Sequence, residues 1–165
     1  MGRGLLPATR SRAYKVMNIS MNIAVFRLSL VKEQALPYAK VPQMHNPADV
    51  ADLIRTYLNG ADREHFIVVF LDARGTAIGI HTVSMGTLTE SLVHAREVFK
   101  GAILANAASI ICAHNHPTGE ARPSEADTSV TAKLVKAGNI LGIRVEDHVI
   151  LGEDQYFSFR SEGLI

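Results

Sequence analysis

The sequence predicts an α/β fold in which a mixed β-sheet is flanked by helices. Two observations carry this prediction. Apolar runs of strand length alternate along the chain with longer stretches whose apolar positions recur at helical spacing. Two of the strand-like runs are also close enough in sequence to form a hairpin, so part of the sheet is expected to be antiparallel.

The first elements are expected to be a strand and a helix. Residues 23–31 (IAVFRLSLV) are predicted to form the strand. A helix is predicted over residues 45–58, because Asn46 is a favoured N-cap, Pro47 suits the first helical position and apolar residues recur on one face. Gly60 is expected to end it.

A β-hairpin is predicted next. Residues 65–72 form a near-continuous apolar run of strand length, and residues 76–83 return as its partner. Residues 73–75 are the turn between them, with Asp72 as the capping residue.

The second half repeats the alternation of helix and strand. Helical periodicity predicts a helix over residues 89–106, followed by a buried strand over residues 108–116. A second helix is predicted over residues 123–142, with Ser124 as N-cap and Gly138 as C-cap. The last two strands are expected at residues 143–152 and 155–160.

Length and composition indicate one compact domain. A chain of 165 residues can bury one sizeable core. No apolar run approaches the roughly 20 residues needed to cross a membrane, which argues against a membrane-spanning protein. Cys112 is the single cysteine, so it forms no internal disulfide, and its apolar surroundings are typical of a buried side chain. No secretory signal is recognised, and a cytoplasmic location is expected.

The charge is unevenly distributed, although the net charge is only +1. Six of the seventeen Lys and Arg residues lie in residues 1–32, which hold no acid, and the other eleven accompany all sixteen acids. We therefore expect residues 1–20 to be a basic, flexible extension and residues 21–165 to form the single domain. The alternative is that this basic arm contacts phosphates or other anionic partners.

The segment from His114 to Asp127 holds the residues most typical of chemistry. His114 and His116 are two residues apart, so in strand geometry both imidazoles project to the same side. Asp127 falls in the first turn of the next helix, where it can face back toward them. Two imidazoles and one carboxylate with an open fourth position are the ligand set of a catalytic zinc ion. The sequence therefore predicts one zinc ion that activates water for hydrolysis.

The same residues also have a purely structural interpretation. Ser124 and Asp127 have the spacing of a capping box, in which a carboxylate in the first turn accepts a backbone hydrogen bond. Histidines also occur at strand ends without any catalytic role. Both interpretations of Asp127 can hold together, since one carboxylate oxygen can bind a metal while the other completes the cap.

Metal-dependent hydrolysis also needs a group that takes and returns a proton, usually a carboxylate just outside the metal ligands. Glu64, at the start of the strand predicted over residues 65–72, is the candidate. It is one of sixteen acids, and composition alone favours a solvated loop residue at this position.

A family resemblance extends this interpretation. The run HNHPTGEARPSEAD resembles the JAMM (MPN+) metalloprotease motif, in which HxHP is followed after six residues by SxxD, and the fuller run is similar to the RadC family. The similarity continues in REHFIVVFLDARG, in TLTESLVHAREVFKGAILAN and in LGIRVEDHVILG, and covers roughly residues 23–165. Two departures are Thr118, where RadC members usually have serine, and the lack of the helix-hairpin-helix region of long RadC proteins.

The resemblance implies a JAMM/MPN core related to the cytidine deaminase-like α/β sandwich. In that core Glu64 would be the general acid/base, and Ser124 would help to stabilise the tetrahedral intermediate as an oxyanion donor. The implied zinc ligands are His114, His116 and Asp127.

Two other features bear on the site. His148 follows Asp147 in a late strand and lies either in the core or behind a metal ligand; we expect a structural role. A zinc deaminase is excluded because it needs a PCxxC that a chain with one cysteine does not contain.

Three functions follow from these features. The leading one is a zinc-dependent hydrolase of amide bonds, a metallopeptidase or isopeptidase whose partner is a peptide or isopeptide substrate. The second is a DNA-associated role in repair or recombination, which is the customary label of RadC proteins. The basic arm is the one sequence feature that supports this role. The third is an MPN interaction module without turnover, against which the intact ligand set argues. The sequence leaves the oligomeric state open.

Overall fold

The computed structural model describes residues 23–36, 43–86 and 93–165. Its strands form one mixed sheet in the order β2-β1-β3-β4-β5, in which β3 and β4 are parallel and the other neighbouring pairs are antiparallel. The strands are β1 (His65–Leu71), β2 (Ala77–Met85), β3 (Ser109–Asn115), β4 (Arg144–Leu151) and β5 (Tyr156–Ser158), and the helices are α1 (Pro47–Tyr57), α2 (Ala95–Leu104) and α3 (Glu125–Leu141). The predicted α/β fold with a mixed sheet is confirmed.

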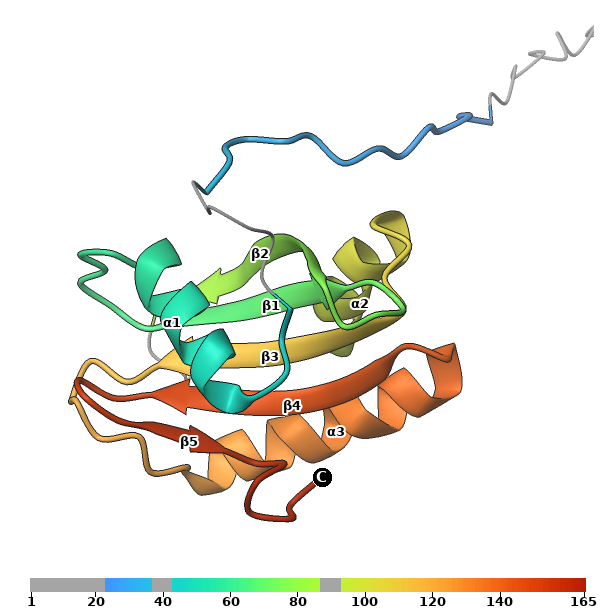
Figure 1. Ribbon diagram of the computed structural model, residues 1–165. Coiled ribbons are helices and arrows are strands. Elements are labelled where there is room, and N and C mark those ends of the chain that lie inside the picture. The colour runs from blue at the N-terminus through green and yellow to red at the C-terminus, as the bar shows by residue number, and fades with distance from the viewer. Residues whose placement is uncertain (1–22, 37–42, 87–92) are drawn as a thin grey trace, which may run out of the picture.

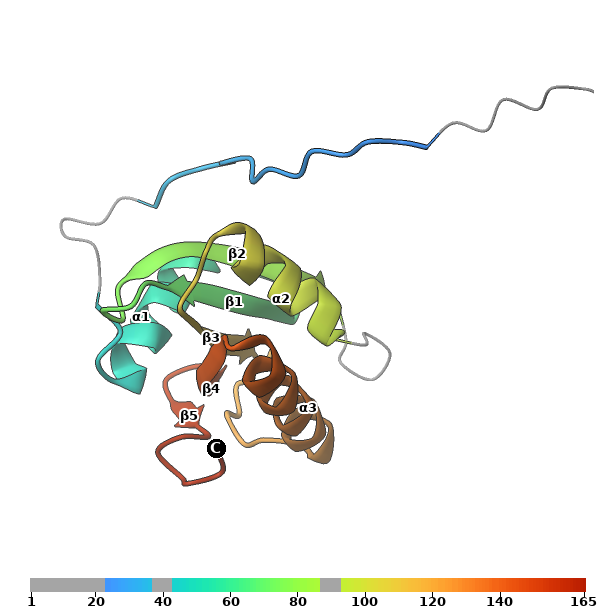
Figure 2. The same ribbon diagram turned by 90° about the vertical axis from the view of Figure 1, so that its right-hand side faces the viewer.

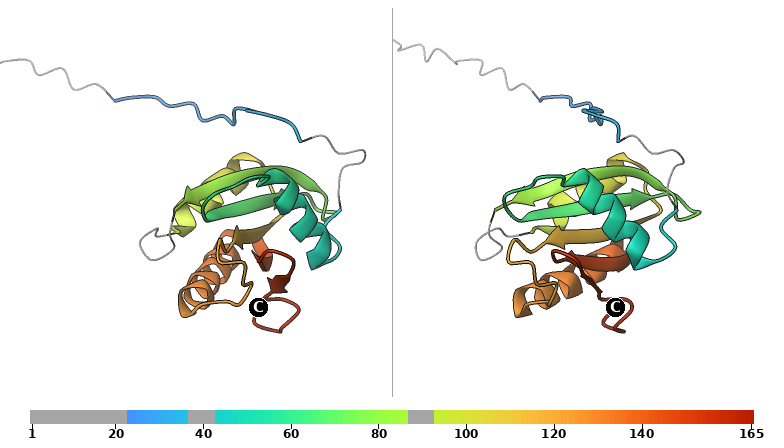
Figure 3. Two further views of the ribbon diagram at one scale, coloured as in Figure 1. Left: turned by 90° about the vertical axis from the view of Figure 1, so that its left-hand side faces the viewer. Right: turned by 60° about the vertical axis from the view of Figure 1, so that its left-hand side comes forward.

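The sheet lies between two helical layers. Helix α1 covers one face, and α2 and α3 cover the other (Figure 2), as Figure 3 shows from the opposite side. Side chains alternate along β1 between the two cores: Phe66 and Val68 pack under α2 and α3, whereas Ile67 and Val69 pack under α1. A strand buried on both faces has a near-continuous apolar sequence, which is why this strand was predictable.

Local signals placed α1 and the hairpin correctly. Asn46 is the N-cap of α1, with Pro47 in its first turn. In the hairpin turn, Oδ1 of Asp72 accepts hydrogen bonds from the backbone N–H groups of Arg74 and Thr76, at 2.8 and 2.9 Å. The predicted N-cap and turn residue are confirmed, whereas the C-cap of α1 is Leu58 and not Gly60.

The strand predicted over residues 23–31 is wrong. Residues 23–36 follow an extended path without sheet pairing (Figure 1). A β-forming sequence becomes a strand through packing and pairing with a neighbour, and none of the described strands pairs with this segment. Its large apolar side chains are exposed: Ile23, Val25, Phe26, Leu28, Leu30 and Val31. The basic extension expected at residues 1–20 lies outside the described residues.

Two helix boundaries also differ from the prediction. Helix α2 begins at Ala95 rather than at residue 89, and residues 87–92 lie outside the described residues. Gly138 is not a C-cap, because α3 continues to Leu141 and ends at Gly142, whose φ is +70°. A Cβ at Gly138 would lie 2.5 Å from the backbone oxygen of Ile143, so this glycine is required for close packing.

Two expectations from composition also bear on the structure. Cys112 is buried in the core, where desolvation raises the pKa of its thiol to about 12, as expected for a structural cysteine. Among the described helices, none combines the length and the apolar character needed to cross a bilayer.

Candidate metal centre

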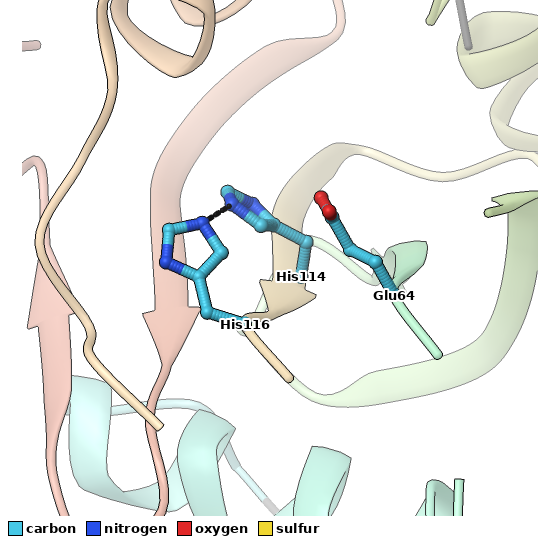
Figure 4. Close-up of side chains that lie close together, drawn as sticks. All are labelled: Glu64, His114 and His116. Atoms are coloured by element: carbon cyan, nitrogen blue, oxygen red, sulfur yellow. Dashed lines mark hydrogen bonds between the residues drawn. The ribbon is translucent and has the colours of Figure 1, made fainter. Parts of the chain in front are cut away.

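Three segments that are distant in sequence meet at the carboxyl end of β3. Glu64 immediately precedes β1, His114 lies in β3 and His116 follows it directly. Figure 4 shows the Glu64 carboxylate beside the two histidine rings, and the ligand atoms of these three residues all lie within 4.8 Å of one another. The first turn of α3 brings Asp127 to the same place, since its Oδ1 lies 3.2 Å from Nε2 of His114. The structure thus brings the predicted site residues together.

His114 faces α3 because of the alternation along β3. Ile110 and Cys112 belong to the core under α2 and α3, and the period of two residues places His114 on the same face. Its side chain is 0% exposed and stacks on the ring of Phe66, with ring centroids 6.0 Å apart. The strand therefore aims this imidazole at the start of α3.

The loop after β3 holds His116 against the end of β4. The backbone N–H of His116 donates to the backbone oxygen of Leu151 at 2.8 Å. Its ring nitrogen Nδ1 lies 2.7 Å from the backbone oxygen of Glu120. The loop approaches Gly152 so closely that a Cβ there would lie 2.3 Å from the oxygen of Gly119. Glycine at residue 152 therefore permits the loop path that returns His116 to the site.

Asp127 completes a capping box and still has one oxygen directed into the site. Its Oδ2 accepts hydrogen bonds from the backbone N–H and the hydroxyl of Ser124, at 2.7 and 2.6 Å. Its Oδ1 is buried and has no hydrogen-bond partner among the described residues. The capping interpretation of Asp127 is confirmed, and the metal-ligand interpretation stays a prediction that the position of Oδ1 permits. A buried carboxylate oxygen without a donor is costly unless a cation binds it.

The Nε2 atoms of the two histidines meet at the same point. A backbone carbonyl only accepts, so His116 donates through Nδ1 to Glu120, and in the neutral ring its Nε2 has a lone pair. Nδ1 of His114 is engaged by Nε2 of His148 at 2.8 Å, which leaves its own Nε2 for the site. The two Nε2 atoms lie 2.9 Å apart. Either a ring hydrogen or a metal ion can lie between two nitrogens at this distance.

The spacing of these atoms suits a tetrahedral metal. Ligand atoms about 2.0–2.1 Å from a tetrahedral zinc ion lie roughly 3.3 Å from one another. The observed separations are 2.9 Å between the two Nε2 atoms and 3.2 Å from Nε2 of His114 to Oδ1 of Asp127. The residues therefore fit one metal ion.

Electrostatics favour a cation at the same point. Burial opposes ionisation of Asp127, but its contacts with the rings of His114 and His116 outweigh burial and hold its pKa below the usual range. The contact with Asp127 raises the pKa of His116, whereas burial lowers the pKa of His114. The site therefore holds a buried carboxylate that is ionised at neutral pH.

Glu64 is held by its neighbours. The backbone oxygen of Glu64 accepts from the backbone N–H of Gly86 at 2.9 Å. Asn115, between the two histidines, accepts from the N–H of His65 at 2.8 Å and donates to the oxygen of Arg63 at 3.0 Å. The side chain of Asn115 thus fixes the residues on both sides of Glu64. Sequence reasoning did not single out Asn115, because its role depends on the pairing of β1 with β3.

Two buried residues lie behind His114. His148 was expected in the core or behind a metal ligand, and its ring contacts that of His114 directly. Thr131 was not identified, and its hydroxyl lies 2.6 Å from Nδ1 of His148. One signal was present in the sequence, since Thr131 follows Asp127 by four residues and lies on the same face of α3.

Comparison with known proteins agrees with the motif. A family model described as the RadC-like JAB domain matches residues 44–164. The chain belongs to the RadC family. A UPF0758 protein of Rubrobacter xylanophilus is 51% identical over 124 residues, covering 75% of this chain and 54% of that protein. A UPF0758 protein of Moorella thermoacetica is 40% identical over 164 residues, covering 99% of this chain and 66% of that protein.

Membership of the RadC family confirms the resemblance that the motif indicated. The JAB domain is related to the JAMM type of metal-dependent hydrolases, which agrees with the possible metal site. This RadC-family chain spans about half the length of the curated relatives it matches, 54% in the case of the Rubrobacter xylanophilus protein. The names of these relatives state no activity, so they add nothing on substrate.

Proposed function

We propose that this RadC-family chain is a zinc-dependent hydrolase of amide bonds, a metallopeptidase or isopeptidase. One observation carries the proposal: Nε2 of His114 lies 2.9 Å from Nε2 of His116 and 3.2 Å from the buried Oδ1 of Asp127, so three groups that can bind a metal converge. A carboxylate, that of Glu64, lies beside the same point. Three such ligands and an adjacent acid/base are the parts that metal-assisted hydrolysis requires.

His114, His116 and Asp127 would hold the zinc ion. Glu64 is also near enough to the histidines to be considered as a ligand. The buried Oδ1 of Asp127 favours Asp127 as the third ligand, because it has no hydrogen-bond donor among the described residues. Zinc bound by three protein ligands supplies Lewis acidity and lowers the pKa of a coordinated water to about 7.

Glu64 is proposed as the proton carrier. A carboxylate beside the site can take a proton from the attacking water and return it to the leaving amine. The support for this role is positional: Asn115 fixes both neighbours of Glu64, so the carboxylate is held beside the histidines.

Ser124 is proposed as the oxyanion donor. Its hydroxyl donates to Oδ2 of Asp127 at 2.6 Å in this structure. Stabilising a substrate oxyanion would require the hydroxyl to turn from Asp127 toward the substrate carbonyl. We propose a peptide or lysine-linked isopeptide as the substrate class, since both place an amide carbonyl and an amine leaving group at such a site.

Zinc content and hydrolysis, measured together, test this proposal. Purified wild type, Glu64→Gln and the control Glu120→Gln are analysed for metal and assayed with fluorogenic peptides and a lysine-linked isopeptide. Glu120 is an exposed acid of the loop between β3 and α3. We expect about one zinc per chain in all three, and loss of hydrolysis by about 100-fold or more in Glu64→Gln alone. Wild type without zinc, or hydrolysis that survives Glu64→Gln, would overturn the proposal.

A further inference from the structure

Two buried polar side chains connect His114 to α3 behind the candidate metal ligands. His148 is 0% exposed and Thr131 is 2% exposed. The hydroxyl oxygen of Thr131 lies 2.6 Å from the backbone oxygen of Asp127 and 2.6 Å from Nδ1 of His148. Nε2 of His148 lies 2.8 Å from Nδ1 of His114. This chain of contacts, the relay, runs from the backbone of one candidate ligand to the ring of another.

The donor and the acceptor of each hydrogen bond in the relay can be assigned. The carbonyl of Asp127 only accepts, so the single hydroxyl hydrogen of Thr131 is donated to it. The second short contact of Thr131 then needs a hydrogen from His148, on Nδ1. Full burial favours an uncharged imidazole, so Nε2 of His148 is an acceptor. His114 therefore donates through Nδ1, and its Nε2 is left with a lone pair.

We propose that Thr131 and His148 are positioning residues that hold His114 in the tautomer able to bind a metal. The proposal rests on the proposed metal site. In the other neutral tautomer, Nε2 of His114 would carry the hydrogen and would not be a ligand. Because Thr131 lies one turn after Asp127 on α3, the relay also ties the His114 ring to the helix that supplies the carboxylate.

Aromatic packing keeps the middle of the relay in place. The ring of His148 is stacked on Phe159, with centroids 5.0 Å apart, and contacts Phe66 edge-on at 5.4 Å. Metal-binding histidines commonly donate their second ring hydrogen to a carboxylate, a backbone carbonyl or water. Here the acceptor is a neutral imidazole, whose own tautomer depends on a threonine hydroxyl. The Thr131 hydroxyl therefore determines which way the hydrogen bonds of the relay run, from His114 to His148 and from His148 to Thr131.

Removing the Thr131 hydroxyl should reverse the hydrogen bond between His148 and His114. In Thr131→Val the Nδ1 hydrogen of His148 loses its acceptor, so His148 is expected to carry its hydrogen on Nε2 and donate it to His114. Nε2 of His114 is then protonated, and zinc affinity should fall about 10–100-fold. Thr131→Ser keeps the hydroxyl and should bind zinc as wild type does. Competition with a chromophoric chelator measures the affinity.

Thr128→Val is the matched control. Thr128 lies on the same helix, and its hydroxyl donates to the backbone oxygen of Ser124 at 3.1 Å, as Thr131 does to that of Asp127. Its side chain is exposed and takes no part in the relay. We expect wild-type zinc affinity in Thr128→Val. Thermal unfolding of each variant separates loss of affinity from loss of fold.

Nitrogen-15 NMR of the imidazoles in metal-free protein tests the relay without zinc. Wild-type His114 should carry its hydrogen on Nδ1, and Thr131→Val should move it to Nε2. Wild-type His114 with its hydrogen on Nε2 would overturn the relay, as would a Thr131→Val protein with unchanged tautomer and unchanged zinc affinity. If wild type binds no zinc, the proposed function fails, but the tautomer measurement still decides the relay.

Discussion

Helices α1 and α3 begin with the same local motif, yet only α3 contributes to the candidate site. At α1, Oδ1 of Asn46 accepts from the N–H of Asp49 at 3.0 Å, and Oδ2 of Asp49 accepts from the N–H of Asn46 at 3.2 Å. At α3, Ser124 and Asp127 make the reciprocal pair of bonds at 3.1 and 2.7 Å. Both are capping boxes, and their spacing in the sequence is identical.

The surroundings of the two carboxylates differ. Asn46 is exposed, and Asp49 is half-buried at the surface. Asp127 is 1% exposed, and its second oxygen faces His114 at 3.2 Å. A capping carboxylate therefore becomes a candidate ligand only where the fold buries it beside other side chains that can bind a metal. The tertiary environment, rather than the motif, separates a cap from a metal site.

Removing each carboxylate in turn gives the largest expected contrast. Asp127→Ala should lose bound zinc almost completely, because one of three ligands is gone. Asp49→Ala should keep about one zinc per chain and lose only about 0.5–1 kcal/mol of unfolding free energy, as for a weakened cap. Metal analysis and urea unfolding measure the two quantities. Full zinc occupancy in Asp127→Ala would mean that Asp127 is only a cap.

The contrast also indicates what the sequence could predict. Caps and periodicity are local, so the capping roles of Asn46 and Ser124 and the position of the hairpin turn follow from the amino-acid sequence alone. Alternation along a regular strand also predicted that His114 and His116 share a side. These signals need no knowledge of which elements meet.

The contact between His148 and His114 depends on a register shift in the sheet that the sequence does not predict. Val145 packs under α2 and α3, and strict alternation from there would place Asp147, not His148, on that face. The pairing of β3 with β4 shifts register between Ile110 and Ile111, so that His148 pairs with Cys112. One extra residue in β4 thus turns His148 toward His114. Asn115 was missed for a related reason, since its contacts cross between strands.

The two N-cap side chains offer a second, smaller contrast. Ser124→Ala and Asn46→Ala each remove a cap and should each cost about 1 kcal/mol of unfolding free energy. If Ser124 also stabilises the oxyanion, hydrolysis of the isopeptide should fall about 100-fold in Ser124→Ala and stay unchanged in Asn46→Ala. Equal turnover in the two variants, at equal zinc content, would limit Ser124 to capping.

The pH dependence of stability should also distinguish the surroundings of the two helix starts. Desolvation holds the pKa of His148, buried behind the α3 cap, well below its usual range. Below about pH 6.5 the unfolded chain takes up a proton at this histidine and the folded protein does not. The stability linked to neutral His148 is therefore intact above this pH and is lost as the pH falls toward the folded-state pKa, by at most about 1.4 kcal/mol per pH unit.

His148→Phe isolates this contribution in metal-free protein. Phenylalanine cannot titrate and keeps an aromatic ring beside Phe66 and Phe159. In urea unfolding between roughly pH 6.5 and 5, the wild type should lose stability more steeply than His148→Phe, by up to about 1.4 kcal/mol per pH unit. Asn46→Ala should be less stable than wild type by the same amount at every pH, since no titrating group is removed. Parallel stability curves for wild type and His148→Phe would show that His148 takes up its proton in the folded protein as readily as in the unfolded chain. The difference between the buried start of α3 and the exposed start of α1 would then rest on Asp127 alone.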